Sequence, residues 1–163
     1  MNPSKDLLLK SLRAVLFGEK LYASDFAEAD WKSIFQLADE QTVSALLLDV
    51  MSLLPSECIT IPLGNKLKRI VTMQRIEQIN RLHRKVIVKI DQALKSEGIP
   101  VVFMKGQTTA LRYPNPFHRT PGDIDFVVNP KDFKKTIDVL EKIGKVDHNL
   151  VHEHHGMAWV DGV

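Results

Sequence analysis

Apolar side chains recur every three or four residues along most of the first 98 residues, which is the spacing of one helical face. The first such stripe occupies residues 7–16 and predicts a helix that ends at Gly18, because glycine tolerates the left-handed backbone of a helix end. A second helix is expected to begin at Ser24 or Asp25, since both side chains can cap the free N–H groups of a first turn.

Two further helices are predicted before residue 100. The shorter one opens at Thr42 or Ser44 and is closed by Pro55, which cannot continue a helix. The longer one runs from about residue 64 to about residue 96 with apolar side chains at near-3.6 spacing. Gly98 supplies its expected C-terminal cap.

The pattern changes at residue 100, from helical periodicity to short apolar runs. Residues 101–104 follow a proline and are typical of a buried strand. The predicted elements after them alternate between helix and strand: a short helix at 107–112, a strand at 124–128, a helix at 129–144 and one or two strands at 150–159. This order predicts an α+β chain, with an N-terminal helical lobe over 1–98 and a mixed-sheet core over 99–163.

The sequence ends on a turn signal. Asp161-Gly162 is typical of a hairpin turn, and Val163 alone follows it. A returning strand is therefore expected beyond the sequence, which predicts a core that is truncated at its C-terminus.

Composition narrows the class of protein. The 163 residues are 44% hydrophobic and 26% charged, which is typical of a soluble globular chain and excludes disordered and fibrous classes. The one cysteine, Cys58, allows no internal disulfide and favours a reducing compartment. Because the sequence begins with no secretory signal and its apolar runs are too short to span a membrane, a cytoplasmic protein without a membrane partner is expected.

Charge is unevenly distributed, although the net charge is only +2. Residues 1–65 carry 5 basic and 9 acidic side chains, whereas residues 66–89 carry eight basic side chains and one acid, Glu77. The favoured interpretation is a solvated helix face that pairs with the acidic first part of the chain. Binding to nucleic acid or to an acidic partner stays open, but no aromatic side chains alternate with these charges, as a stacking site for single strands would require.

The sharpest local pattern is the pair of aspartates at Asp123 and Asp125, separated by Ile124. Because side chains alternate along a strand, the two carboxylates would share one face, with their Cα atoms about 6.5–7 Å apart, while Ile124 and Phe126 point into the core. Two carboxylates at that separation suit one or two hard divalent cations. The alternative interpretation is a strand edge that begins with two solvated aspartates.

A second pattern, Lys105-Gly106, lies between the strand at 101–104 and the next helix. Glycine at such a junction lets the backbone approach a phosphate, and the helix N-terminus presents free N–H groups to an anion. Lys105 adds a cation, and Thr108 adds a hydroxyl. An ordinary strand-to-helix turn is the alternative, but a Lys-Gly turn beside an Asp-x-Asp strand favours a phosphate site.

These residues together resemble the nucleotidyltransferase superfamily that includes DNA polymerase beta. The resemblance rests on Phe103 to Gly106, Tyr113-Pro114, Arg119 and the run from Gly122 to Val128. More narrowly, the chain is similar to a bacterial group described as uncharacterised nucleotidyltransferases, which its helical first half also fits.

The resemblance implies site residues and a cofactor. Asp123 and Asp125 would be the catalytic ligands of Mg²⁺ or Mn²⁺, and Gly106 with its neighbours Lys105 and Thr108 would contact the nucleoside triphosphate. Gln107 stands where many members have a serine or glycine, so Thr108 would have to supply the usual hydroxyl contact.

The superfamily pattern also implies a third carboxylate, on a later strand, that binds metal and acts as base toward the attacking hydroxyl. Asp161 lies at the predicted turn, and Glu153 is the other candidate. A missing third acid fits truncation and equally fits an inactive relative.

Arg119 and a group of histidines are the remaining candidates. Arg119 precedes the aspartates in a loop, where its planar fork of donors suits a triphosphate; a solvated arginine, or one paired with an aspartate, is the alternative. The histidines at 148, 152, 154 and 155 lack a zinc-type spacing and a supporting cysteine, so a wet or partner-facing strand edge is the favoured interpretation.

The expected function is metal-dependent transfer of a nucleoside monophosphate from a nucleoside triphosphate to an acceptor hydroxyl, with release of pyrophosphate. The acceptor is open between a small molecule, a protein and an RNA end. The alternative is an inactive module of the same fold that binds nucleotide or a partner protein. Low activity is expected of these 163 residues, as is self-association through an open sheet edge or the helical lobe, which would give a homo-oligomer.

Overall fold

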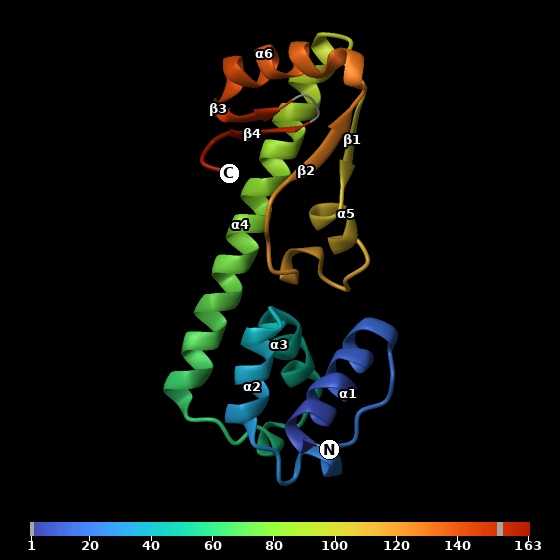
Figure 1. Ribbon diagram of the computed structural model, residues 1–163. Helices are drawn as coiled ribbons and strands as arrows, with labels where there is room; N and C mark the ends of the chain where they lie inside the picture. Colours follow the sequence, from blue (N-terminus) through green and yellow to red (C-terminus); the bar gives the residue numbers. More distant parts are fainter. Residues whose placement is uncertain (1, 153–154) are drawn as a thin grey trace. The chain divides into compact units, whose positions relative to one another are not determined.

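The computed structural model describes residues 2–152 and 155–163 and contains six α-helices and four strands within them (Figure 1). The helices are α1 (Pro3–Phe17), α2 (Trp31–Glu40), α3 (Ser44–Leu53), α4 (Leu63–Ser96), α5 (Gly106–Ala110) and α6 (Phe133–Ile143). The strands are β1 (Val101–Met104), β2 (Asp125–Val128), β3 (Lys145–His152) and β4 (His155–Trp159). In the described part of the chain, no helix combines the length and apolarity that a membrane span requires.

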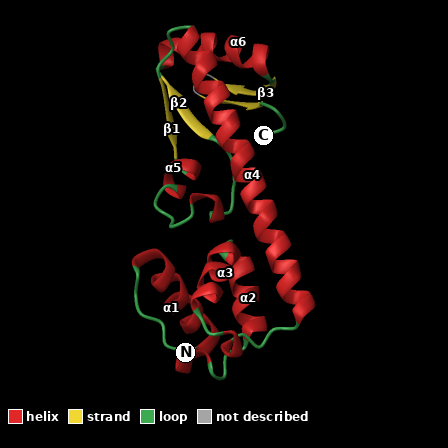
Figure 2. Ribbon diagram, turned by 180° about the vertical axis from the view of Figure 1, so that it is seen from behind, coloured by secondary structure: helices red, strands yellow, loops and turns green. Residues whose placement is uncertain are grey.

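The chain divides into two compact units, which we call the helical unit and the sheet unit. The helical unit comprises residues 1–78 and 110–120, and the sheet unit comprises residues 79–109 and 121–163. Helix α4 therefore contributes its first half to the helical unit and its second half to the sheet unit. The described strands, yellow in Figure 2, belong to the sheet unit.

The helical unit packs α1, α2 and α3 around one apolar core. Trp31 lies at its centre, 2% exposed, with its ring 5.5 Å from that of Phe26 and its indole N–H donating to the carbonyl of Cys58 at 2.7 Å. Helix α1 ends as predicted, because Gly18 adopts φ +72° and donates its N–H to the carbonyl of Ala14.

The expected start of the second helix is wrong. Ala23–Phe26 forms a single 3₁₀ turn, in which the Asp25 carboxylate accepts from the Tyr22 N–H and pairs with Lys10. Helix α2 begins only at Trp31, where Asp30 caps it by accepting from the N–H of Ser33 at 3.2 Å. The capping residue is therefore the aspartate nearest to the apolar stripe.

The helical unit also contains a buried histidine, His118, in the segment 110–120. Its side chain is 7% exposed and lies between two carboxylates: Nδ1 is 2.7 Å from Asp49 and Nε2 is 3.0 Å from Glu77. Burial disfavours the charged imidazole, but the hydrogen bonds to Asp49 and Glu77 outweigh burial and raise the pKa of His118 above its ordinary value. The contacts of His118 with Asp49 and Glu77 tie segment 110–120 to α3 and to the first half of α4.

The long helix predicted from about residue 64 to 96 is confirmed as α4, and its C-terminal cap is confirmed as well. Gly98 adopts φ +73°, and the N–H of Ile99 returns to the carbonyl of Leu94 at 2.9 Å. The basic run of α4 finds acidic partners within each unit, since Arg69 pairs with Asp39 and Lys89 with Asp161.

The sheet unit confirms the expected pairing of residues 101–104 with 124–128. β1 and β2 are antiparallel neighbours, with Val101 opposite Val128 and Met104 opposite Asp125. β3 and β4 form a second antiparallel pair, and α6 packs on β3. The buried side chains of this unit come from the second half of α4, from α6 and from the strands.

The α+β class is confirmed, but the described strands contain no parallel pair, so the expected mixed sheet is not formed among them. The reason lies in the connection after β1. A parallel crossover needs a helix that runs back along the sheet, whereas α5 has five residues and the chain then joins the helical unit over residues 110–120 before β2 begins.

The predicted hairpin turn at Asp161-Gly162 is present. Both residues have positive φ, +54° and +84°. The residues on either side of the turn form two hydrogen bonds: the Val160 N–H donates to the Val163 carbonyl at 2.8 Å, and the Val163 N–H donates to the Val160 carbonyl at 3.1 Å. This is the geometry of a tight two-residue turn.

Candidate active site

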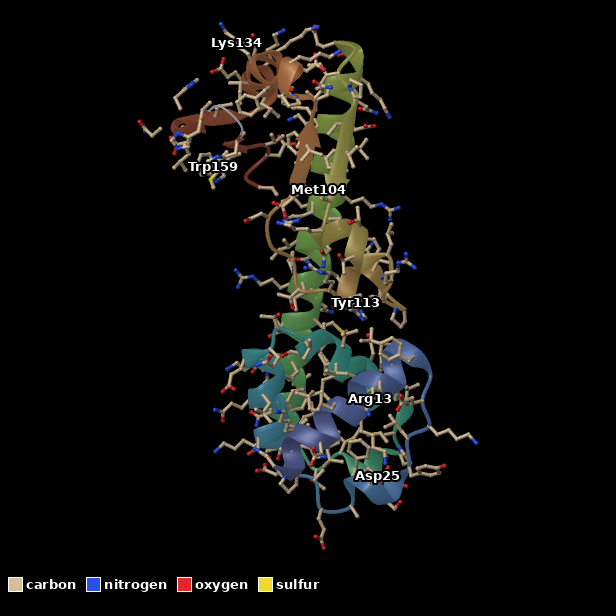
Figure 3. The ribbon with its side chains drawn as sticks, turned by 45° about the vertical axis from the view of Figure 1, so that its right-hand side comes forward. Arg13, Asp25, Met104, Tyr113, Lys134 and Trp159 are labelled. Carbon is tan, nitrogen blue, oxygen red and sulfur yellow. The ribbon has the colours of Figure 1, made fainter. Side chains whose placement is uncertain are left out.

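Several residues of the predicted site lie where the end of β1 is next to the start of β2. Met104, the last residue of β1, lies opposite Asp125, the first residue of β2 (Met104 is labelled in Figure 3). The turn that follows β1 therefore lies next to the segment that precedes β2. Lys105, Gly106 and Thr108 occupy the turn, and Asp123 and Asp125 occupy the adjacent segment.

Gly106 occupies a position that favours glycine for two reasons. Its φ is +28°, and a Cβ placed on it would lie 3.2 Å from the backbone carbonyl oxygen of Asp123. Lys105 before it also has positive φ, +46°. The turn thus brings the start of α5 within close range of the backbone of the acidic segment.

The hydroxyl of Thr108 and the N–H groups of Thr108 and Thr109 form hydrogen bonds within the turn. The Thr108 hydroxyl donates to the carbonyl of Lys105 at 2.6 Å, and the N–H groups of Thr108 and Thr109 point to the same carbonyl at 2.8 and 3.1 Å. Contact of the Thr108 hydroxyl with a phosphate would therefore require its rotation away from Lys105.

Asp125 and Asp123 differ in their surroundings. Asp125 is half-buried at the start of β2, and the ammonium group of Lys105 lies 3.7 Å from its carboxylate. Asp123 is exposed and lies in the loop before the strand, not in the strand as the alternation predicts. Ile124 and Phe126 pack on the core as expected.

Both aspartates line one cavity of about 370 Å³ within the sheet unit. Its walls come from the second half of α4, from the acidic segment and from β4 with the turn after it. A volume in this range holds a small-molecule ligand or a large part of one. The cavity thus combines two carboxylates with a partly apolar lining.

Arg119 is not among the residues that the sheet unit brings together. It belongs to segment 110–120 of the helical unit, where its guanidinium donates to the carbonyl of Thr120 at 3.1 Å. Of the two candidates for a third carboxylate, Asp161 belongs to the sheet unit and pairs with Lys89 at 2.7 Å in the turn after β4. Glu153 lies outside the described residues, as does His154.

The carboxylates fit a divalent cation by donor chemistry. Mg²⁺ prefers oxygen ligands and is commonly held by one or two carboxylates together with substrate phosphates, so a protein cage is not required. In the described part of the chain, no three His, Cys, Asp or Glu side chains converge on one point.

The sequence analysis missed His83, which lines the same cavity from α4. The side chain is 4% exposed, and burial lowers the pKa of His83 below its ordinary value although the charge of Asp123 acts in the opposite direction. A signal was present: buried positions of α4 fall at 80, 83, 86, 90 and 94, so the histidine lies on the helix face that meets the core.

Comparison with known proteins gives one match. A family described as "Uncharacterised nucleotidyltransferase" matches residues 27–161, which confirms the resemblance drawn from the motifs. The matched residues include α2 to α4 and most of the residues that line the cavity. The family match therefore includes helices of the helical unit together with the part of the chain that carries the two aspartates. Searches of curated proteins and of solved structures gave no match.

Proposed function

Because the chain belongs to the uncharacterised nucleotidyltransferase family, we propose that it moves a nucleoside monophosphate from a nucleoside triphosphate to an acceptor hydroxyl. The acceptor oxygen forms a bond to the α-phosphorus, the bond from that phosphorus to the bridging oxygen breaks, and pyrophosphate leaves with the electron pair. The hydroxyl proton passes to water. The observation that supports this proposal most strongly is that Asp123 and Asp125 line one cavity beside the Gly106 turn.

Each residue of the turn and the acidic segment has a role in this proposal. Asp123 and Asp125 hold Mg²⁺ or Mn²⁺, which when bound neutralises charge on the phosphates. Gly106 leaves room for a phosphate against the turn, and Lys105 exchanges its contact with Asp125 for one with the triphosphate. Thr108 is proposed to contact the triphosphate once its hydroxyl has rotated away from the Lys105 carbonyl.

The proposal is tested by nucleotide binding and turnover in parallel. Isothermal titration with Mg²⁺ and each of ATP, GTP, CTP and UTP is expected to show binding that Asp123→Asn and Asp125→Asn abolish. Asp138→Asn, an exposed position on α6, is the matched control and should bind as the unmodified chain does. Equal affinity in Asp123→Asn and Asp138→Asn would contradict the proposed metal site.

A pyrophosphate-release assay separates the enzyme from a module that only binds nucleotide. Release that depends on Asp123 supports transfer. Binding without release supports the inactive module, which the ion pair between Asp161 and Lys89 favours because it occupies the one described candidate for the third acid.

A further inference from the structure

The first half of α4 exposes four apolar side chains, which we call the α4 stripe: Leu63, Leu67, Ile70 and Val71. Each of them is between 42% and 71% exposed. Because a helix turns by about 100° per residue, all four lie within about 100° of its circumference. An apolar face of this width normally packs against another element, whereas these four side chains are open to solvent.

A groove adjoins the α4 stripe. It lies between α3 and the first half of α4, both labelled in Figure 1, and has a volume of about 330 Å³. Ile70 belongs to the stripe and also to the wall of the groove, so the two form one continuous surface. The wall contains Met51 and Met73, whose unbranched side chains adapt to partners of different shape. A concave apolar surface of this kind suits the packing of an amphipathic helix.

Basic residues border both edges of the α4 stripe. Lys66 lies about 40° of helix rotation from the nearest apolar position on one edge, and Arg75 lies about 40° from it on the other, next to Lys68. Residues 63–76 carry four basic side chains and no acidic one. In the described part of the chain, the side chains of Lys66, Lys68 and Arg75 form no ion pair. Their charges are therefore available to a partner.

These charges discriminate among the partners that could cover the stripe. A second copy packed through the same stripe would bring four further basic side chains against these four, and like charges in contact oppose association. An anionic membrane would neutralise the basic edges but would leave the groove beside them unfilled. A helix with an apolar strip and acidic flanks satisfies both features, since it fills the groove and neutralises the two edges.

We propose that the α4 stripe and its groove form a docking surface for an amphipathic helix of another protein, with acidic residues on both sides of its apolar strip. The apolar side chains of that helix recur at three- and four-residue steps and pack on the stripe and into the groove. Its carboxylates pair with Lys66, Lys68 and Arg75. This surface belongs to the helical unit, whereas Asp123 and Asp125 belong to the sheet unit, so the proposal does not depend on the proposed transfer reaction.

The test uses three stapled helical peptides labelled with fluorescein, whose binding is measured by fluorescence anisotropy. The first carries leucines at three- and four-residue steps and glutamates on both sides of them. The second has lysines in place of the glutamates, and the third has the composition of the first with its leucines spread around the helix. The first peptide should bind about tenfold more tightly than either of the others. Equal binding of the three peptides, or no binding of the first, would overturn the proposal.

A substitution within the stripe locates the contact. Leu67→Glu places a charge in the middle of the stripe and should weaken binding of the first peptide about tenfold. Leu9→Glu, at an exposed position on α1, is the matched control and should leave binding unchanged. Both leucines are exposed, so neither variant places a charge in the core. Equal binding by the two variants would contradict the proposed position.

Charge reversal at the edges tests the acidic character of the partner. The double variant Lys66→Glu/Lys68→Glu should reverse the preference, so that the lysine peptide binds more tightly than the glutamate peptide. Lys5→Glu/Lys20→Glu changes the net charge equally at exposed positions away from α4 and should keep the preference for glutamate. The same outcome in both double variants would show that net charge alone selects the peptide, and the proposal would fail.

Two further measurements test the other partners. Sedimentation velocity should give the same association state for Leu67→Glu and the unmodified chain; self-association that Leu67→Glu abolishes would show that a second copy covers the stripe. Vesicles of phosphatidylcholine and phosphatidylglycerol should not bind through the stripe, and vesicle binding that Leu67→Glu abolishes would assign it to a membrane surface. Either result would overturn the proposal.

Discussion

Among the described residues, each unit buries one histidine, and the surroundings of the two histidines differ. His118 in the helical unit has carboxylate partners at both ring nitrogens, which raise its pKa above the ordinary value against the effect of burial. His83 in the sheet unit has an unpartnered Nδ1 and a pKa that burial lowers. A buried polar group with its partners in place stabilises the fold, whereas one without them costs the fold the desolvation of that group.

The largest expected effect is the loss of folding stability on replacing His118, compared with the loss on replacing His83. His118→Phe removes both hydrogen bonds and leaves Asp49 and Glu77 against an apolar ring, so it should lower the free energy of unfolding by about 2 kcal/mol. His83→Phe removes an unsatisfied atom and should lower it little or not at all.

Each unit contains one of the two tryptophans, Trp31 and Trp159, so thermal unfolding can be followed by fluorescence in single-tryptophan variants. Trp159→Phe leaves Trp31 to report on the helical unit, and Trp31→Phe leaves Trp159 to report on the sheet unit. Similar losses of stability from both histidine substitutions would contradict the contrast between a partnered His118 and an unpartnered His83 Nδ1.

A smaller effect is expected at Gly18 in the helical unit and Gly106 in the sheet unit, two of the four glycines with positive φ. Gly106→Ala and Gly18→Ala both place a Cβ at positive φ, which should destabilise the chain by about 1 kcal/mol in each case. A Cβ at Gly18 meets nothing within 4 Å, whereas one at Gly106 would lie 3.2 Å from the Asp123 carbonyl. Gly106→Ala alone should therefore weaken Mg²⁺-dependent nucleotide binding, measured by titration; equal binding in both variants would show that the turn does not position the acidic segment.

The smallest expected effect is a pH dependence of opposite sign at the two histidines. Since the pKa of His118 is raised in the fold, its contribution is complete below pH 6.5, the ordinary pKa, and is lost as the pH rises through the raised value. Since the pKa of His83 is lowered, its neutral form favours folding above that pH, and this contribution is lost as the pH falls.

Chemical denaturation between pH 5 and 8, compared with each Phe variant, should therefore show two differences that change in opposite directions. The stability difference between the unmodified chain and His118→Phe should shrink as the pH rises. The stability difference between the unmodified chain and His83→Phe should grow as the pH rises. Parallel trends would contradict a raised pKa at His118 and a lowered pKa at His83.

The elements that a local pattern encodes could be predicted from the sequence. The periodicity of α4, its glycine cap at Gly98 and the apolar run of β1 each depend on neighbouring residues, and each is present in the structure. The predicted start of the second helix was wrong because Ser24, Asp25 and Asp30 are all competent caps. In the structure the Asp25 carboxylate pairs with Lys10, which lies 15 residues away along the chain, and Asp30 caps α2.

The histidines could not be placed by local patterns. His118 meets Asp49 and Glu77, which lie 69 and 41 residues away along the chain, so no spacing in the sequence announces the cluster. His83 lies within a run of basic residues, and the charge of that run indicated a solvated face. The proximity of the Gly106 turn to Asp123 was predicted, because it follows from the pairing of two short strands.

The path of the chain limits how this protein can be dissected. Between the two units the backbone crosses three times, at residues 78–79, 109–110 and 120–121. A fragment cut at residue 98 would carry Asp49 and Glu77 without His118, and the complementary fragment would lack the part of α4 that carries His83. Isolating the helical unit for separate study would instead require an engineered linker from residue 78 to residue 110, so that the histidine stays with its carboxylates.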